Sequence, residues 1–402
     1  MPGAVGEPDH QGCWTGSVIR AHNRFHIFYT GWNPALTPSQ TICHAVSDDC
    51  VRWTKDPANP ILAPDPERYA LSDWRDPFVF WNPDEACYWM LITAKLAPQH
   101  SALGRGCLAL AKSPDLSEWR LQPPLWLYES FHPPECPDLL ALGERLVLLF
   151  SDVFTMHRTA PGLAGPWCRP ADSRLDDQGF YAAKTFHCGD RHVLVGWIAS
   201  HAENKDAGAR LWGGALSLPR DLSVDDQGRL RIACAPEVRS LFTRAPLHAE
   251  RQWRVLSGEW TFRHDGITAD PSRGDALAVL ADLPKDYRAE VQMTLAPNAR
   301  AGIILRLSDA GDSGYLLTLD QSRQRLAFRR WEGCREGRPI YERPVQIRPE
   351  EPFKVEIFLR GTVLEVFVAD AVALSARCYD RPSGHLALYA TTARVTFTPP
   401  AP

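Results

Sequence analysis

The chain has 402 residues, 45% of them apolar, and a formal net charge of −4. This length allows two well-packed domains, because single hydrophobic cores stop growing near about 250–300 residues. The charges form no basic block, so we expect neither nucleic acid nor an anionic membrane as a partner. The first residues lack a basic and apolar leader, and no run of about 18 apolar residues occurs, which favours a cytoplasmic, unexported protein.

The 11 cysteines are an odd number and form no close CxxC pair. This pattern fits neither a disulfide scaffold nor a zinc site, so we expect reduced thiols. His22 and His26 flank a hairpin turn, and we expect them at the surface rather than on a metal. No metal and no cofactor is predicted.

A repeat of short β-type segments occupies the first half of the chain. The segments are runs of four to eight apolar or alternating residues separated by turns, which predicts an all-β protein. Four copies cover residues 13–53, 74–119, 135–167 and 180–222. Each copy supplies about four strands, and this period is typical of the blades of a β-propeller.

The first two copies end in the same pattern, A-x-S-x-D-x-x-x-W. We interpret the Ser/Asp turn and the Trp as elements of blade packing rather than of catalysis. The matching positions are Ala45, Ser47, Asp49 and Trp53, then Ala111, Ser113, Asp115 and Trp119.

The repeat stops after Leu222, and a different β pattern follows from Trp253 onward. Its short strands alternate with period 2 between regular turns, which predicts an antiparallel β-sandwich. We therefore predict a propeller over residues 1–240 and a sandwich over residues 250–402. The second half contains no clustered His, Cys or carboxylate group that indicates a site.

The opening strands of the repeats are the predicted place for chemistry, because the inner strands of propeller blades meet around a central channel. The residues at this position are Trp14-Thr15-Gly16-Ser17, Arg75-Asp76-Pro77, Glu135-Cys136-Pro137-Asp138, and Phe180-Tyr181 with Lys184.

Two carboxylates, Asp76 and Glu135, occupy what we take as matching positions of successive blades. Unpartnered inward-facing carboxylates are costly to bury, so paired carboxylates with aromatic neighbours indicate a sugar site. Arg75 would keep Asp76 ionised, while Glu135 beside Cys136 would be the protonated acid. The alternative is structural, with an Arg75–Asp76 ion pair and Glu135 at a turn.

Several segments resemble the motifs of glycoside hydrolase family 32, the invertases, inulinases and levanases. They are GCWTGSVI, WTKDPANPIL, WRDPFVFW, PECPDLLAL, GPW, FYAAKTF and VGWI. The RDP and ECPD motifs come in the family's order, about 60 residues apart. VEIFLRGTVLEVFVADAVALSARCY in the second half is similar to the family's sandwich domain.

The resemblance implies a role for each matching residue. Asp76 would bind sugar hydroxyls and stabilise the transition state, and Glu135 would be the general acid/base. Trp14 and Thr15 would line the fructose pocket, with Thr15 where the family has serine.

Four further residues would bind the substrate or lie beside the residues that do. Arg75 and Cys136 would stand beside the two carboxylates, and Tyr181 and Lys184 of the FYAxK element would also bind the sugar.

The resemblance also implies that one part of the family's machinery is absent. Family members have five blades, and the first carries the nucleophilic aspartate in an Asn-Asp-Pro-Asn-like or Gly-Asp-Pro-like motif, which does not occur here. Asp9 matches a linker aspartate instead. We therefore expect a β-fructofuranosidase-type retaining glycosidase without its first blade, with little activity in residues 1–402 alone.

Two alternatives remain. The chain could be a carbohydrate-binding remnant that keeps the pocket without catalysis, or a related five-bladed enzyme acting on arabinosides. Sucrose, inulin, levan and short fructo-oligosaccharides remain alternative substrates, and fructosyl transfer remains an alternative to hydrolysis.

Overall fold

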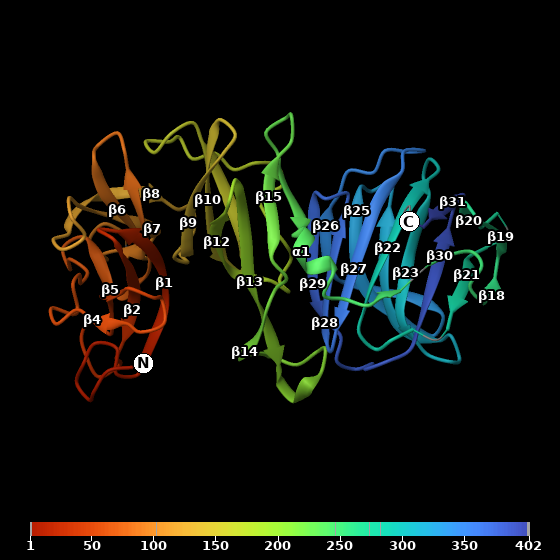
Figure 1. Cartoon of the computed structure of the whole chain (residues 1–402), viewed down its shortest axis with the longest axis horizontal. Helices are drawn as coiled ribbons and strands as arrows, with labels where there is room; N and C mark the ends of the chain where they lie inside the picture. The colour runs from red at the N-terminus through yellow and green to blue at the C-terminus, as the bar shows by residue number, and fades with distance from the viewer. Residues whose placement is uncertain (1, 102, 246, 273, 282, 400–402) are drawn as a thin grey trace. The chain divides into compact units, whose positions relative to one another are not determined.

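A computed structural model describes residues 2–101, 103–245, 247–272, 274–281 and 283–399. Nearly all regular structure in this part of the chain is β-strand, which confirms the predicted all-β class (Figure 1). The helices within these ranges are the short turns η1 (Ala202–Asn204) and α1 (Pro236–Arg239). None of the described helices has the length and apolar character to cross a membrane.

Four antiparallel sheets correspond to the four sequence repeats. The first contains β1 (Gly12–Ala21), β2 (Arg24–Trp32), β3 (Gln40–Ser47) and β4 (Thr54–Lys55). The second contains β5 (Tyr69–Asn82), β6 (Cys87–Leu96), β7 (Gly106–Ser113) and β8 (Arg120–Leu127). The third contains β9 (Glu135–Leu142), β10 (Arg145–Asp152) and β11 (Phe154–Ala160). The fourth contains β12 (Tyr181–Cys188), β13 (Arg191–His201), β14 (Arg210–Leu216), β15 (Arg220–Val224) and β16 (Leu230–Cys234).

The repeated Ser/Asp turn has a structural role, as predicted. Oδ1 of Asp49 accepts hydrogen bonds of 2.8 Å from the two backbone N–H groups that follow Cys50, and Nε1 of Trp53 donates to the Cys50 carbonyl oxygen at 3.2 Å. Asp115 and Trp119 make the corresponding turn in the second sheet. The aspartate satisfies backbone donors that the end of the strand leaves free, so the turn leads from the third to the fourth strand in each of these two sheets.

One prediction about the first sheet is wrong. His26 is 9% exposed, and its Nδ1 lies 3.0 Å from Nε2 of His44, whose Nδ1 lies 3.0 Å from Asp56 Oδ2. The alternation of β2 directs His26 to a buried face, whereas His22 in the turn is exposed as expected.

Two sheets form the predicted sandwich. The first has the order β19-β20-β31-β22-β27-β28-β29, with β17 on β22, and the second has the order β18-β21-β30-β23-β24-β25-β26. Strands of the first are β17 (Arg244–Ala245), β19 (Glu259–Arg263), β20 (Gly266–Asp270), β22 (Tyr287–Leu295), β27 (Phe353–Arg360), β28 (Val363–Val368), β29 (Val372–Arg377) and β31 (Val395–Thr398). Strands of the second are β18 (Trp253–Ser257), β21 (Ala276–Leu280), β23 (Arg300–Leu307), β24 (Ser313–Asp320), β25 (Arg325–Glu332), β26 (Arg335–Pro344) and β30 (His385–Thr391).

One large apolar core lies between these two sheets. Alternate residues of each strand point into it, among them Val291 and Met293 on β22 and Ile303 and Leu305 on β23. This is the period-2 pattern that predicts a sandwich from the sequence.

The chain packs into two compact units. One contains the residues up to Ser173 with Ala182–Lys184, and so holds the first three sheets; the other contains Arg174–Tyr181 and everything from Thr185 onward. The second unit therefore includes the sandwich and most of the fourth sheet. The proposed boundary near residues 240–250 stays a prediction.

Candidate active site

The opening strands are irregular at one repeated point. Asp76 on β5, Cys136 on β9 and Ala182 on β12 have φ values of 57°, 51° and 52°, in the left-handed region that side chains disfavour. Pairing of β5 with β6 and of β9 with β10 shifts register at this point, and β1 shifts between Trp14 and Gly16. Such bulges re-aim side chains and are common beside active sites.

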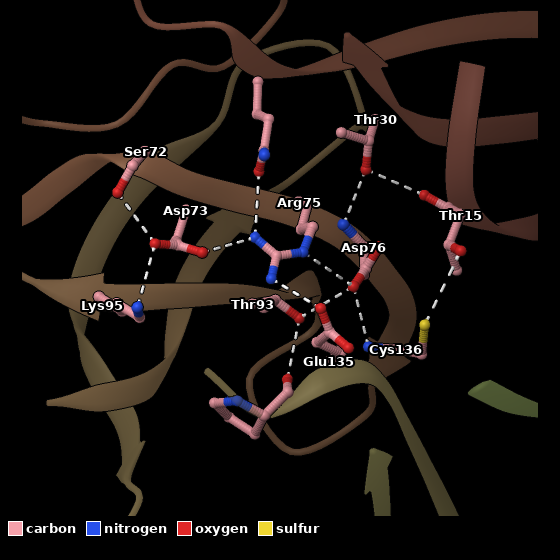
Figure 2. Close-up of polar contacts among 12 residues, drawn as sticks. Thr15, Thr30, Ser72, Asp73, Arg75, Asp76, Thr93, Lys95, Glu135 and Cys136 are labelled. Carbon is pink, nitrogen blue, oxygen red and sulfur yellow. Dashed lines mark hydrogen bonds and ion pairs between the residues drawn. The ribbon is translucent and has the colours of Figure 1, made fainter. Parts of the chain in front are cut away.

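Hydroxyl side chains of the second strands hold these irregular residues. The backbone N–H of Asp76 donates to Oγ1 of Thr30 at 2.8 Å, and that of Ala182 donates to Oγ of Ser151 at 3.1 Å. Thr93, at the corresponding place on β6, donates to the carbonyl oxygen just before β9 at 2.9 Å. A hydroxyl group of the second strand thus contacts the opening of the next blade in each case, and Figure 2 shows the contacts of Thr30 and Thr93.

Arg75 lies between the predicted carboxylates. Its Nη2 is 2.8 Å from Oε1 of Glu135, and its Nε is 3.8 Å from Oδ2 of Asp76. Nη1 donates to Oδ1 of Asp73 at 2.8 Å and to Oε1 of Gln40 at 3.1 Å. Burial alone would lower the pKa of Arg75, but the three carboxylates outweigh burial and raise it.

Asp76 is the buried member of the pair, with 4% of its surface exposed. Its Oδ2 accepts a hydrogen bond of 3.0 Å from the Cys136 N–H and a longer one of 3.4 Å from Thr93. Burial raises the pKa of Asp76, although the charge of Arg75 acts in the opposite direction. Glu135 is more open, with 31% of its side chain exposed.

One detail of the sequence interpretation needs correction. By backbone conformation Asp76 corresponds to Cys136, so Glu135 corresponds to Arg75 and the two carboxylates are one residue out of register. We also expected Arg75 to keep Asp76 ionised, and the guanidinium does favour the ionised form, although burial acts against it and raises the pKa of Asp76. Whether Asp76 is ionised in the site stays a prediction.

The predicted pocket residues of β1 and β9 come together. Sγ of Cys136 lies 3.8 Å from Oγ1 of Thr15, and both residues adjoin the Arg75 cluster in Figure 2. Trp14 is half-buried and stacks on Trp32, with ring centroids 4.9 Å apart. Trp14 therefore presents a supported aromatic surface next to Thr15.

Lys184 and Tyr181 belong to different units. Nζ of Lys184 donates to the Pro137 carbonyl oxygen at 2.7 Å, lies 3.8 Å from Asp138 Oδ2, and lies 4.7 Å from the centre of the Phe78 ring. Lys184 thus reaches the opening of β9, where Glu135 begins the strand. Tyr181 opens β12 in the second unit, and its role stays a prediction.

Asp9 is held as a structural residue. It is 2% exposed, and its Oδ2 accepts hydrogen bonds from Tyr29 at 2.8 Å and from Lys55 at 2.6 Å. Burial would raise the pKa of Asp9, but these donors lower it overall. A carboxylate committed to several donors is a poor nucleophile, which agrees with its assignment to a linker.

The sequence interpretation missed several residues around the pair. Asp73 binds Arg75 and lies 3.5 Å from Nζ of Lys95, while Gln40 reaches Arg75 from β3. Asp73 was detectable, because it precedes Arg75 by two positions and so shares its face of β5. Gln40 and Lys95 carry no such signal, since the fold alone brings them near.

The site therefore has two carboxyl groups in unlike surroundings, joined by a half-buried guanidinium. One is enclosed and the other is partly open to solvent, the contrast that lets one carboxyl hold charge while another transfers a proton. Among the described residues, no three His, Cys, Asp or Glu side chains gather as a metal-binding group.

Known proteins with similar structures share the fold. The chain superposes on fructan 1-exohydrolase IIa from Cichorium intybus with a TM-score of 0.73, covering 98% of this chain and 85% of that one at 17% identity. A sucrose-6-phosphate hydrolase from Lactobacillus gasseri gives a TM-score of 0.71, covering 98% and 80% at 18% identity. At these identities the likeness establishes architecture alone.

Sequence comparison goes further. A sucrose-6-phosphate hydrolase from Zymomonas mobilis is 25% identical over 393 residues, covering 90% of this chain and 71% of the relative. One from Escherichia coli is 26% identical over 412 residues, covering 96% and 78%. The family model described as the glycosyl hydrolases family 32 N-terminal domain matches residues 4–234, more than half of the chain. The chain therefore belongs to glycosyl hydrolase family 32.

Proposed function

We propose that this chain supplies the acid/base and the transition-state stabiliser of a retaining β-fructofuranosidase that cleaves sucrose or fructans. The observation that carries the proposal is the placement of Arg75 between Asp76 and the more exposed Glu135. Membership of the family and the relatives named sucrose-6-phosphate hydrolase support the substrate class.

Glu135 acts as the acid and then as the base. Its proton passes to the glycosidic oxygen as the bond from that oxygen to C2 of the fructosyl unit breaks, while a carboxylate nucleophile bonds to C2. Glu135 then removes a proton from water, which attacks C2, breaks the ester and releases fructose. The partial exposure of Glu135 gives it access to both the leaving group and water.

Asp76 stabilises the positive charge that develops on the sugar ring. The Cys136 N–H and Thr93 fix its carboxylate in place, so little reorganisation is needed during the reaction. Trp14, Thr15 and Lys184 would contact the fructosyl unit together with Cys136, with Tyr181 assigned the same role on its sequence motif.

The nucleophile is the residue that the described site does not supply. The carboxylate of Asp9 accepts hydrogen bonds from Tyr29 and Lys55. The carboxylate of Asp73 accepts hydrogen bonds from Arg75 and Ser72 and pairs with Lys95. We propose that an aspartate outside residues 1–402 provides it, about 5–5.5 Å from Glu135 as in retaining enzymes.

The test compares residues 1–402 with a longer chain that includes any blade encoded upstream. Both are assayed on sucrose, sucrose 6-phosphate and inulin, each with Glu135→Gln and with Glu144→Gln, an exposed turn residue, as the matched control. We expect turnover in the longer chain only, reduced at least a thousandfold by Glu135→Gln and unchanged by Glu144→Gln.

Other results would change the proposal. Brisk turnover by residues 1–402, abolished by Glu135→Gln, would place the nucleophile within the chain, and Asp73→Asn would then test the nearest candidate. Sugar binding without turnover by either chain would favour a carbohydrate-binding remnant.

A further inference from the structure

A second group of charged residues lies on the sandwich. A hollow of about 480 Å³ is lined by residues from the strands β23, β25, β26 and β30 and the turns beside them. It is within the 300–1,000 Å³ range of small-molecule sites. The lining residues are Asp275, Arg300, Arg323, Arg329, Cys334, Arg335, Glu336, Tyr389, Thr391 and Thr392.

The hollow opens on the face of the sheet away from the sandwich core. On β30, Leu388 and Ala390 point into the core, so Tyr389 and Thr391 point the other way. On β23, Ala301 points into the core, which leaves the neighbouring Arg300 on the outer face. The fold thus places arginines and hydroxyl groups on one outer surface.

Positive charge exceeds negative charge in this lining. Four arginines stand against two acids, Asp275 and Glu336. Asp275 accepts a hydrogen bond of 2.9 Å from the hydroxyl of Tyr389. Glu336 contacts Arg300 and lies 3.6 Å from Nη1 of Arg329.

Two more acids stand behind the arginines at the outer limit of ion pairing. Asp320 lies 3.9 Å from Nε of Arg300 and 3.8 Å from Nε of Arg323, and Glu342 lies 3.9 Å from Nη2 of Arg329. These distances exceed those of hydrogen-bonded pairs. Nη1 of Arg329 donates to the Gly337 carbonyl oxygen at 3.2 Å, and other guanidinium donors of the group remain only partly used.

Two arginines of the hollow have a donor without a partner among the described residues. The Nε–H groups of Arg300 and Arg329 are buried, and neither has an acceptor within hydrogen-bonding distance in the described part of the chain. Buried donors normally have partners, so each of these needs an explanation. Burial lowers the pKa of Arg329, and the charge of Arg300 lowers it further. An incoming anion would relieve the repulsion between these two guanidinium groups.

We infer that this hollow binds a phosphoryl group, as a small phosphorylated sugar or as free phosphate. Guanidinium groups match the oxygen geometry of phosphate and bind it through paired hydrogen bonds. The space beside the arginines carries the hydroxyl groups of Tyr389, Thr391 and Thr392, which suit the hydroxyls of a sugar. The site belongs to the sandwich and is independent of the proposed catalytic residues.

The experiment titrates residues 1–402 with inorganic phosphate, glucose 6-phosphate and glucose by isothermal titration calorimetry. We expect both phosphates to bind and glucose not to bind. Arg335→Gln and Arg329→Gln should each weaken phosphate binding at least tenfold. The matched control is Arg348→Gln, whose side chain is 73% exposed and pairs with Glu351 outside the hollow, and it should bind like the unchanged protein.

Glu336→Gln should have the opposite effect on phosphate affinity. Removing this carboxylate frees Arg300 and Arg329, so phosphate should bind several-fold more tightly. Because Arg335 is the exposed first residue of β26, we expect its substitution to leave the fold intact, which keeps the test valid if Arg329→Gln unfolds the sandwich.

The two sources of the phosphoryl group give different results. Tighter binding of glucose 6-phosphate than of phosphate, lost in Thr391→Val, identifies a phosphorylated sugar, whereas equal affinities identify free phosphate. The inference is overturned if neither phosphate binds at 10 mM, if glucose binds equally well, or if Arg335→Gln and Arg348→Gln behave alike.

Discussion

Nη2 of Arg75 lies 2.8 Å from Oε1 of Glu135, across 60 residues of sequence and between two blades. The same guanidinium also contacts Asp73, Asp76 and Gln40, so a single side chain sets the spacing of the site. The planar fork of arginine can reach these partners together, whereas a lysine ammonium acts as one point charge.

Arg75→Lys should therefore keep the charge and lose the geometry. In the active longer chain we expect kcat to fall about a hundredfold with a smaller change in KM, because misplacing catalytic groups affects the transition state most. Steady-state kinetics with sucrose measures this. An unchanged kcat would mean that Arg75 has only a structural role.

Replacing the carboxylate by an amide should have opposite effects on folding stability at Asp76 and at Asp73. Burial raises the pKa of Asp76, so its charged form opposes folding and its contribution to stability is lost as pH rises through the folded pKa. For Asp73, burial acts in the same direction, but Arg75, Ser72 and Lys95 outweigh it and lower the pKa. The stability that the ionised Asp73 contributes is present above its pKa in the unfolded chain, and it is lost as the pH falls through its pKa in the folded protein.

At pH 7 we expect Asp76→Asn to stabilise the first unit by on the order of 1 kcal/mol and Asp73→Asn to destabilise it by a similar amount. The Asp76→Asn gain should shrink as pH falls, and it should vanish below about pH 3, where the Asp76 carboxyl is protonated in both the folded and the unfolded protein. Thermal unfolding of the two variants between pH 3 and 8 measures both effects. Equal signs at pH 7 would contradict the assignment.

The thiol of Cys136 should be unreactive in the folded protein. Burial raises its pKa well above the usual value, and the charge of Asp76 adds to this effect. Because the thiolate is the reactive form, we expect iodoacetamide at pH 8 to label exposed Cys50, Cys168 and Cys188 at least tenfold faster than Cys136. Peptide mass spectrometry follows each site, with the urea-unfolded protein as control. Equal labelling rates would show that the pocket beside Thr15 is open.

The sequence predicts the architecture well because both halves follow local rules. Period-2 alternation and turn residues define the strands of the sandwich, and the repeated Ser/Asp turn defines the first two blades. The third sheet is less regular, since in the described residues its fourth strand is reduced to a bridge between Thr159 and Cys168. That copy also closes more loosely in the sequence, at Gly165-Pro166-Trp167.

The candidate site was predictable in part. The blade openings locate Asp76 and Glu135, but the one-residue offset between them depends on the left-handed backbone of Asp76 and Cys136, which no local pattern reveals. The raised pKa of Asp76 depends on the packing around it, which the neighbouring Arg75 in the sequence does not reveal. The arginine hollow of the sandwich was missed because its residues are spread from Asp275 to Thr392.

The second unit depends on a buried charge cluster centred on Arg220. Nη1 of Arg220 lies 2.8 Å from Asp176 Oδ2, and Nη2 lies 2.8 Å from Glu365 Oε2 and donates to Ser375. The Arg220 side chain is fully buried and packs on the ring of Phe180 at 4.2 Å. This cluster ties β15 to the sandwich strands β28 and β29 within the unit.

Removing only the cation from this cluster should be strongly destabilising. Arg220→Met leaves two buried carboxylates without a counter-charge, which commonly costs about 3–5 kcal/mol. Adding Asp176→Asn and Glu365→Gln removes those charges as well, so the triple variant should recover most of the loss. Arg229→Met, at an exposed pair with Asp225, should change stability by less than about 0.5 kcal/mol.

The loss of folding stability caused by Arg220→Met should also depend on pH. Burial raises the pKa of Glu365, although Arg220 opposes this in the unchanged protein. Without Arg220 a larger rise is expected, so the carboxyl takes up a proton as pH falls and the buried charge disappears. Stability lost at pH 7 should therefore be partly regained near pH 5, because a raised carboxyl pKa favours the folded state at low pH. Urea unfolding at both pH values, with hydrogen exchange of β15, β28 and β29, measures this. A loss below about 1 kcal/mol at pH 7, or one that grows on acidification, would show that the charges of the cluster are solvated or compensated elsewhere.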